Sequence, residues 1–515
     1  MQSNKYDRQL RLWGAHGQAR LASAHVALVN ASASGTESLK NLVLPGVGRF
    51  TVLDAQPVTE ADLANNFFVT REWLGKPRAE ATCALLCELN PDVQGAAVVE
   101  DGAMRAARNP RSFAAYTLVI ATQLNEAALL DVAAACAQCS IPLVVARTNG
   151  LLGHVRVWCH EHCVVESKPS PEPQEDLRVF NPWPQLRATA DAVALEKLDE
   201  QEFGHTAFVI VLIKALDAWR AAHSGKAPTG MKEKEAFLAS IRAMSREGYG
   251  AEENLVEAVD KAFLCYSERP VPQAVQDLLS DSAASTLTAA SPNFWILVNA
   301  LAGFVAQHKV LPLSGVLPDM KSTTASYIAL QRVYRAKAMD DLAEVSRAVD
   351  VALAQLGRPS SSISAEERAL FCANAYHVCV DRYTSLADEF APRASTTQAV
   401  AEAVMDGVGD STPQSPMVWY LCWRAFDATQ GKSADAILAK AKQLCATYQI
   451  DPALVSASHA KEMVRFAGCE PHAIAALVGG IASQEAVKLI TGQYIPLNNT
   501  FVYNGIAGVG AQYRL

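Results

Sequence analysis

Short apolar runs alternate with helical patterns over the first part of the chain. The apolar run at 24–30 is followed by small residues, and 35–44 then has apolar residues at helical spacing until Pro45–Gly46. A second apolar run at 50–53 ends in Asp54. This order of strand, turn, helix and strand within about 30 residues predicts a βαβ unit of a nucleotide-binding fold.

The same alternation continues along the chain. We predict, in order, a helix at 78–90, strands at 93–100 and 118–122, a helix at 126–138 and a strand at 143–146. Alternating strands and helices predict a mainly parallel sheet with both faces covered. The runs at 154–158 and 163–166 predict an antiparallel extension of that sheet.

Changes in periodicity divide the chain into parts. Five prolines fall within 168–184, so we predict an extended crossover linker at 168–186. From 187 to 455 the pattern is almost entirely helical, and the end returns to an apolar helix and a strand. The sequence therefore predicts an α/β domain made of 1–167 and 456–515, interrupted by a large, mostly helical insertion at 187–455.

Composition narrows the class of partner and the compartment. There are 45 basic and 53 acidic residues, and the net charge of −8 disfavours nucleic acid and membrane surfaces as main partners. Residues 1–20 lack the apolar segment of a signal peptide, and no apolar run appears long enough to span a bilayer. Twelve scattered cysteines are typical of reduced thiols. We expect a soluble protein of the cytoplasm and the nucleus.

Seven segments carry a more specific signal. They are, in order, 5–18 (KYDRQLRLWGAHGQ), 30–55, 65–68 (NNFF), 175–187 (EDLRVFNPWPQLR), 291–297 (SPNFWIL), 315–320 (GVLPDM) and 470–493. Together they resemble the adenylating, ThiF/MoeB-like fold of the ubiquitin-activating enzymes, and within it the regulatory subunits of neddylation-activating enzymes. The resemblance covers nearly the whole chain and implies a Rossmann-like fold with an inserted domain like the catalytic-cysteine domain.

The resemblance implies a nucleotide site that has changed. Active adenylating subunits have glycines in a pattern like GxGGxG after the first strand, which let the backbone approach the phosphates. The matching positions here are Asn30, Ser32, Ala33 and Gly35, and only the last is glycine. The added side chains are expected to crowd a phosphate. Asp54 stands where a ribose-binding acid is usual, and a turn residue at a strand end is the alternative interpretation.

Three further positions of the implied site differ from the family. Active subunits bring an arginine and a lysine to the transferring phosphates and an aspartate to magnesium. This chain has Asn65, Arg78 and Gln123 at these positions. A neutral amide is a poor ligand for a hard dication. We therefore expect that this chain does not adenylate by itself and binds no cofactor of its own, with ATP and magnesium held by a partner subunit.

The thioester step also lacks its residues. Active enzymes of the family carry a nucleophilic cysteine followed by threonine, and this chain has no Cys-Thr pair. We interpret five cysteines as buried structural thiols in helical segments: Cys265, Cys372, Cys379, Cys422 and Cys445. The pair Cys136 and Cys139 lacks a second pair, and the cluster from Cys159 to Cys163 alternates between the two faces of a strand. We therefore predict no metal site.

One positive chemical role remains for the N-terminal segment. In the related dimeric enzymes, the arginine of the YxRQ opening reaches into the partner's nucleotide site, and the matching residue is Arg8. Arginine is a permanently charged, planar donor that suits phosphate. Tyr6, Gln9 and Trp13 are expected to position this arm. The alternative is a frayed, solvated arginine.

The resemblance implies a regulatory subunit that forms an obligate heterodimer with a catalytic subunit. The pair would adenylate the ubiquitin-like modifier of the neddylation pathway, move it to the partner's cysteine and pass it to a conjugating enzyme, with cullins as the main targets. Three alternatives stay open: a self-sufficient adenylating enzyme, a dinucleotide-dependent oxidoreductase and a free-standing scaffold.

The pair Gly479–Gly480 lies within the apolar helix near the end of the chain. Glycine inside a helix lowers its stability. The pair therefore predicts the close approach of another element, either within the chain or at a dimer interface.

Overall fold

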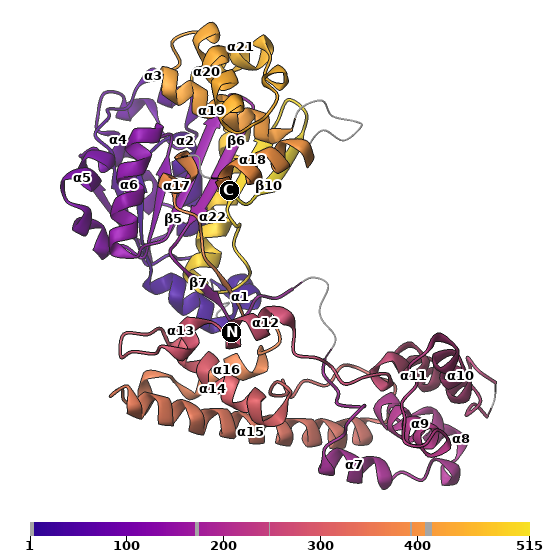
Figure 1. The fold of residues 1–515 in the computed structure, drawn as a ribbon. Helices are drawn as coiled ribbons and strands as arrows, with labels where there is room; N and C mark the ends of the chain where they lie inside the picture. The colour runs from indigo at the N-terminus through magenta and orange to yellow at the C-terminus, as the bar shows by residue number, and fades with distance from the viewer. Residues whose placement is uncertain (1–4, 170–174, 247, 392–393, 407–414) are drawn as a thin grey trace. The chain divides into compact units, whose positions relative to one another are not determined.

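The computed structural model describes residues 5–169, 175–246, 248–391, 394–406 and 415–515. These residues form two compact units (Figure 1). Unit 1 comprises Met1–Val164 and Val380–Leu515, and unit 2 comprises Val165–Cys379. The chain is therefore an α/β unit interrupted by an insertion, as the sequence predicts.

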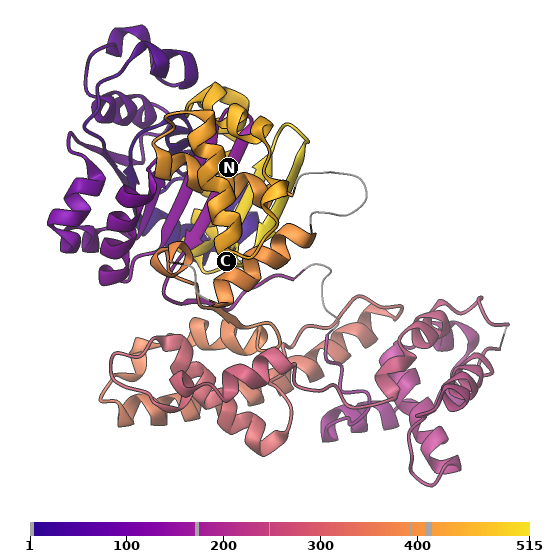
Figure 2. The same cartoon turned by 45° about the horizontal axis from the view of Figure 1, so that its top comes forward.

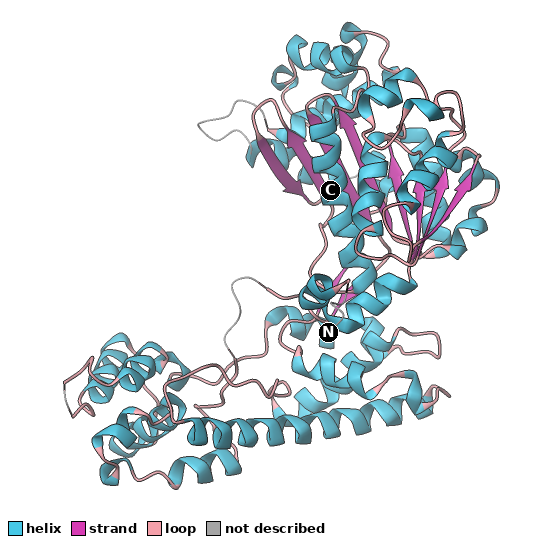
Figure 3. Ribbon diagram, turned by 180° about the vertical axis from the view of Figure 1, so that it is seen from behind, coloured by secondary structure: helices cyan, strands magenta, loops and turns pink. Residues whose placement is uncertain are grey.

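An eight-stranded sheet forms the centre of unit 1, with the order β10-β9-β6-β5-β4-β1-β2-β3 (Figure 3). Its strands are β1 (His25–Val29), β2 (Arg49–Leu53), β3 (Gln94–Val98), β4 (Leu118–Thr122), β5 (Leu143–Asn149), β6 (Leu152–Trp158), β9 (Thr500–Asn504) and β10 (Val509–Tyr513). The first five strands are parallel, and β6, β9 and β10 pair in antiparallel fashion. The predicted parallel sheet is confirmed, and so is its antiparallel extension at 154–158, but the run at 163–166 is not part of this sheet. Two short strands, β7 (His162–Val164) and β8 (Cys379–Asp381), form a separate sheet.

Helices cover the sheet of unit 1. They are α1 (Asp7–Ser23), α2 (Ala33–Val43), α3 (Glu60–Asn65), α4 (Arg78–Cys87), α5 (Gly102–Arg108), α6 (Glu126–Cys139), α17 (Leu386–Phe390), α18 (Ala394–Asp406), α19 (Pro416–Thr429), α20 (Ala434–Thr447), α21 (Ala457–Phe466) and α22 (His472–Thr491). All five residues of β4 are buried, as expected for a strand with both faces covered. Both α2 and α22 pack against β4 and β5, and they pack against each other.

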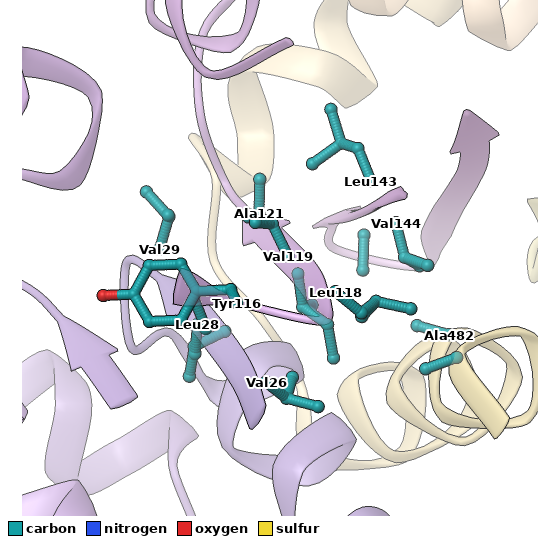
Figure 4. Packing of buried hydrophobic residues seen from close by; sticks show 14 of the residues in the cluster. Val26, Leu28, Val29, Tyr116, Leu118, Val119, Ala121, Leu143, Val144 and Ala482 are labelled. Atoms are coloured by element: carbon teal, nitrogen blue, oxygen red, sulfur yellow. The ribbon is translucent and has the colours of Figure 1, made fainter. Parts of the chain in front are cut away.

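The main core of unit 1 lies between the parallel strands and α22. Val26 of β1, Leu118 of β4 and Val144 of β5 are fully buried in one cluster with Ala482 of α22 (Figure 4). Burial of each large aliphatic side chain stabilises the fold by roughly 1.5–3 kcal/mol. The C-terminal helix is therefore part of the same core as the first strands.

By length and composition alone, α22 could cross a membrane, and it is the one such helix in the described part of the chain. This differs from the sequence expectation that no apolar run is long enough. Of its most apolar window, 61% is buried inside the structure. Its apolar character therefore follows from its place in the core of unit 1.

The insertion ends earlier than the sequence predicts. The predicted boundary between insertion and C-terminal part lies at 456, but unit 1 resumes at Val380. Helices α18 to α21 share a buried cluster with Leu152 of β6 and Val502 of β9. A helical period shows that a segment packs on a core, but it does not show which core. The predicted boundary at 456 is therefore corrected to Val380.

Unit 2 is helical, as expected (Figure 2). Its helices are α7 (Pro184–Asp191), α8 (Glu200–Gly204), α9 (Phe208–Ala222), α10 (Met231–Arg242), α11 (Glu253–Asp260), α12 (Gln273–Leu279), α13 (Ser282–Ser285), α14 (Asn293–His308), α15 (Thr324–Gln355) and α16 (Ala365–Ala373). Part of the predicted linker 168–186 falls on 170–174, outside the described residues. From 175 onward this segment packs onto unit 2, because Leu177 and Val179 are buried in its largest cluster.

The two glycines of α22 differ in their surroundings. A Cβ on Gly479 would lie 2.9 Å from Ser34 O and 3.0 Å from Ser38 N of α2. A Cβ on Gly480 would meet no atom within 4 Å. Close packing within the chain therefore explains Gly479, whereas Gly480 faces open space.

We predict opposite effects for alanine at these neighbouring positions. Gly479→Ala should lower the free energy of unfolding by about 1–3 kcal/mol, because the methyl group collides with the backbone of α2. Gly480→Ala is the matched control and should leave stability unchanged or raise it by up to about 1 kcal/mol. Thermal and denaturant unfolding of both variants measure the difference. Equal effects at the two positions would contradict the packing described here.

Candidate functional site

A cavity of about 470 Å³ lies in unit 1, next to the carboxyl ends of β1, β4 and β5. In Rossmann-type sheets this is where ligands bind, since the strand order reverses between β1 and β4. The cavity is lined by six of the eight predicted nucleotide-site residues: Asn30, Ser32, Ala33, Asn65, Arg78 and Gln123. The other two, Gly35 and Asp54, lie close by but do not line the cavity.

The first turn of α2 explains why one glycine remains. Ser32 caps the helix by accepting from Gly35 N at 3.3 Å, and it donates to Thr122 Oγ1 at 3.0 Å. A Cβ on Gly35 would lie 2.9 Å from Thr122 Oγ1 and 3.0 Å from Leu28 Cδ1. Gly35 is therefore needed so that α2 can lie against β1 and β4, which is a packing role independent of any phosphate.

Asp54 and Arg78 form an ion pair beside the cavity. The carboxylate of Asp54 is 3% exposed, accepts from two backbone N–H groups at 2.8 Å, and accepts from Arg78 Nε at 2.7 Å. Arg78 also donates to Asp62 at 3.0 Å and to the side-chain oxygen of Asn30. Each of the three guanidinium nitrogens therefore has a partner inside the chain. A ribose hydroxyl would have to compete with Arg78 for Asp54.

The two remaining predicted positions are also engaged within the chain. Gln123 Oε1 accepts from Thr148 N at 2.9 Å, and Gln123 Nε2 donates to Thr148 O at 2.8 Å. The side-chain amide of Gln123 therefore forms two hydrogen bonds with the backbone of Thr148 in β5, as a neighbouring strand would. Asn65 ends α3, and its Oδ1 accepts from the thiol of Cys469 at 3.3 Å. Neither side chain presents a charge to the cavity.

Sequence reasoning missed a buried acid at the cavity. Glu470 is 5% exposed, and its carboxylate accepts from Ser34 Oγ at 2.8 Å, Ser34 N at 3.2 Å and Thr148 Oγ1 at 2.9 Å. Burial raises the pKa of Glu470, and these hydrogen bonds oppose the rise only in part. The available signal was an acid followed by Pro471 directly before α22.

A second ion pair at the cavity was also missed. Arg147 of β5 donates to both oxygens of Asp427 on α19, each at 2.7 Å. Its guanidinium lies 5.5 Å from the centre of the Trp423 ring. The partners are 280 residues apart in sequence, so no local pattern could reveal the pair. In both pairs the arginine at the cavity wall is therefore already bound to a carboxylate of the same chain.

The N-terminal helix α1 holds the predicted arm. Tyr6 Oη donates to Asp92 at 2.9 Å, and its ring lies where a Cβ on Gly46 would come within 2.8 Å. Trp13 is 9% exposed and donates through Nε1 to Gln18 at 2.9 Å. Gln18 lies on the same helix and donates to Pro45 O at 2.8 Å, and Trp13 belongs to the main core cluster of unit 1. Tyr6 and Trp13 therefore attach the first turns of α1 to the rest of unit 1.

Arg8 lies between these two anchors and is exposed. It makes no hydrogen bond or ion pair with the residues that the structure describes. Gln9 is partly buried. By contrast, Arg11 on the same helix is paired with Asp7 at 2.8 Å. Contact of Arg8 with a partner's nucleotide stays a prediction.

Four of the five cysteines interpreted as structural are buried: Cys265, Cys372, Cys422 and Cys445. Cys379 is partly buried and begins strand β8, so its predicted helical setting is wrong. In the cluster at 159–163, burial raises the pKa of Cys159 to about 12. Within the described ranges, no group of three His, Cys, Asp or Glu residues is arranged to hold a metal ion.

Comparison with known proteins identifies the family. A model of the ThiF family matches residues 6–509. The NEDD8-activating enzyme E1 regulatory subunit of Xenopus laevis is 38% identical, over 100% of this chain and 99% of that protein. This chain belongs to that family of regulatory subunits, within the ThiF family. Proteins of the same name from Gallus gallus and Danio rerio are 36% and 37% identical, over 100% and 99% of this chain and 98% of each relative.

The buried ion pair of this ThiF unit gives a stability prediction. Arg78→Ala should lower the free energy of unfolding of unit 1 by about 3 kcal/mol, because it leaves the buried carboxylate of Asp54 without its cation. Arg71→Ala is the control, since Arg71 pairs with Glu60 at the surface, with side chains 77% and 64% exposed, and should change it by less than about 1 kcal/mol. Denaturant unfolding measures both. An Arg78→Ala protein as stable as the Arg71→Ala protein would contradict this account.

Proposed function

We propose that this chain is the regulatory subunit of a heterodimeric activating enzyme for the ubiquitin-like modifier NEDD8. The catalytic partner subunit binds ATP and magnesium, adenylates the modifier and forms the thioester. The observation that carries the proposal is the state of the chain's own site. Asn65, Arg78 and Gln123, which stand where active relatives bind the phosphates and magnesium, are each hydrogen-bonded to another group of the same chain.

The charges around the cavity explain why this chain's own site does not support adenylation. Phosphoryl and adenylyl transfer need cations to neutralise the developing charge. Arg78 is bound to Asp54 and Asp62, and Arg147 is bound to Asp427, so each cation already has a carboxylate partner. Gln123 offers an amide that is already paired with β5. The reaction therefore takes place at the partner's site.

The geometry of α1 supports a role for Arg8 in that partner site. The helix is anchored by the hydrogen bond of Tyr6 to Asp92 and by the burial of Trp13 in the core of unit 1, so the arginine between them extends from a fixed base. Leu12 follows one turn later and is 55% exposed, which gives the same side of the helix an apolar contact point. We infer that this side of α1 docks on the catalytic subunit and that Arg8 reaches its nucleotide.

A second surface on unit 1 supports the heterodimer. The side of α22 turned away from α2 carries an uncharged row at helical spacing: Ala473, Ala476, Leu477, Gly480 and Ile481. At the start of this row the ring of Phe67, 77% exposed, packs edge-on against His472. Adjacent apolar residues on a surface mark protein interfaces. This row is therefore the second part of the proposed contact with the catalytic subunit.

The remaining partners follow from the same proposal. The assembled enzyme binds the NEDD8 modifier, transiently binds a conjugating enzyme, and acts in the cytoplasm and the nucleus. Unit 2 helps to form the groove around the modifier. No nucleic acid or membrane partner is proposed.

Exchange of labelled pyrophosphate into ATP, in the presence of magnesium and modifier, tests the division of labour. The chain alone should show no exchange, and the heterodimer should show robust exchange. Arg8→Ala in the heterodimer should lower the exchange rate by about 100-fold, because one cation at the transferring phosphates is lost. Arg11→Ala is the matched control and should keep the rate.

Gel filtration must show that both variants still form the heterodimer. Exchange by the chain alone would support a self-sufficient adenylating enzyme instead. A wild-type rate for Arg8→Ala in an intact heterodimer would remove the proposed role of the arm.

A further inference from the structure

The carboxylate of Glu470 lies at the N-terminus of the helix that follows the first strand. Its Oε2 accepts from the backbone N–H of Ser34, the second residue of α2, at 3.2 Å. Its Oε1 accepts from the hydroxyl groups of Ser34 and Thr148, at 2.8 and 2.9 Å. The carboxylate of Glu470 thus accepts hydrogen bonds from one backbone N–H group and two hydroxyl groups, which belong to α2 and β5.

In a Rossmann-type unit, this position belongs to a phosphate. The first N–H groups of the helix after β1 have no partner within the helix, and the helix dipole favours negative charge there. The first turn of α2 contains no acidic residue of its own. The negative charge instead comes from Glu470, 436 residues away in sequence.

The chain holds this carboxylate firmly in place. Gly468 N donates to Asn149 Oδ1 at 3.0 Å, and Gly150 N donates to Cys469 O at 2.9 Å. Gln123 Nε2 donates to Gly468 O at 3.3 Å. The segment 468–470 is therefore fixed to the ends of β4 and β5. Glu470 is positioned by the same strands that would frame a nucleotide.

We propose that Glu470 is an internal anionic ligand that occupies the phosphate position of this ThiF unit and thereby excludes the phosphates of a nucleotide. Two anions cannot share the same first-turn donors, because each needs the same N–H and hydroxyl groups and they repel each other. This inference concerns the chain's own cavity. It stands whether or not Arg8 acts in a partner's site.

Binding of inorganic pyrophosphate to the full chain, measured by isothermal titration calorimetry without magnesium, tests the inference. The wild type should show no saturable binding up to the order of 10 mM. Glu470→Ala removes the internal anion and opens space, so it should bind pyrophosphate at least about 10-fold more tightly than the wild type. Glu470→Gln keeps the shape but removes the charge and should show a smaller gain.

Two further variants test whether the gain in pyrophosphate binding arises at the N-terminus of α2. Glu252→Ala is the matched control, since Glu252 is 6% exposed in unit 2 and likewise accepts from a hydroxyl, that of Ser245, and a backbone N–H, that of Arg246. It should bind no pyrophosphate. Adding Ser32→Asp to Glu470→Ala should abolish the gain, because aspartate also caps a helix and returns a negative charge to the start of α2.

The pyrophosphate affinities of these variants decide between the inference and its rejection. A gain in Glu470→Ala that disappears with Ser32→Asp supports the inference. A folded Glu470→Ala protein with the affinity of the wild type overturns it, and so does a gain that survives Ser32→Asp. If the alanine variant does not give a cooperative thermal transition, Glu470→Gln decides, and unchanged affinity in that folded variant also overturns the inference.

Discussion

The contact between α2 and α22 holds unit 1 together. It joins a helix near residue 40 to a helix near residue 480, and only Gly479 lets the two backbones approach so closely. At the head of the same contact, Glu470 binds the first turn of α2. The two parts of unit 1 are separated by the whole of unit 2. The pairing of β6 with β9 joins the sheet across this insertion, and the contact between α2 and α22 joins the core. The shape of the cavity depends on it.

Under the proposed function, the cavity belongs to an adenylating framework that keeps its fold without carrying out the reaction itself. A nucleotide would supply anions to a helix N-terminus and a partner to the strand-end acid. Here Glu470 takes the first role and Arg78 takes the second. Buried charges that lose a ligand must find another partner, since an unpaired buried charge costs several kcal/mol. The changed residues therefore maintain the structure, and the exposed surfaces around Arg8 and α22 carry the proposed function.

The sequence predicts the βαβ unit and the sheet type, because these depend on local periods and spacing. The residues that surround the cavity are predicted from the resemblance to adenylating enzymes. Asn30, Arg78 and Gln123 all line the cavity, as the resemblance implies. The end of the insertion could not be predicted, because the period of α18 to α21 is the same on either core. The role of Glu470 and the ion pair of Arg147 with Asp427 could not be predicted either, because the interacting residues lie hundreds of positions apart in the sequence. A local sequence pattern predicts whether a segment is a helix or a strand, but contacts between distant residues determine which core it packs on and which groups it pairs with.

The number of nucleotides bound by the assembled heterodimer tests the central claim most directly. Equilibrium dialysis with a non-hydrolysable ATP analogue, at concentrations well above its dissociation constant, gives this number. The account predicts one nucleotide per heterodimer, and none when the partner's own nucleotide site is disabled by mutation. Two nucleotides per heterodimer, or one that remains after the partner's site is disabled, would contradict it.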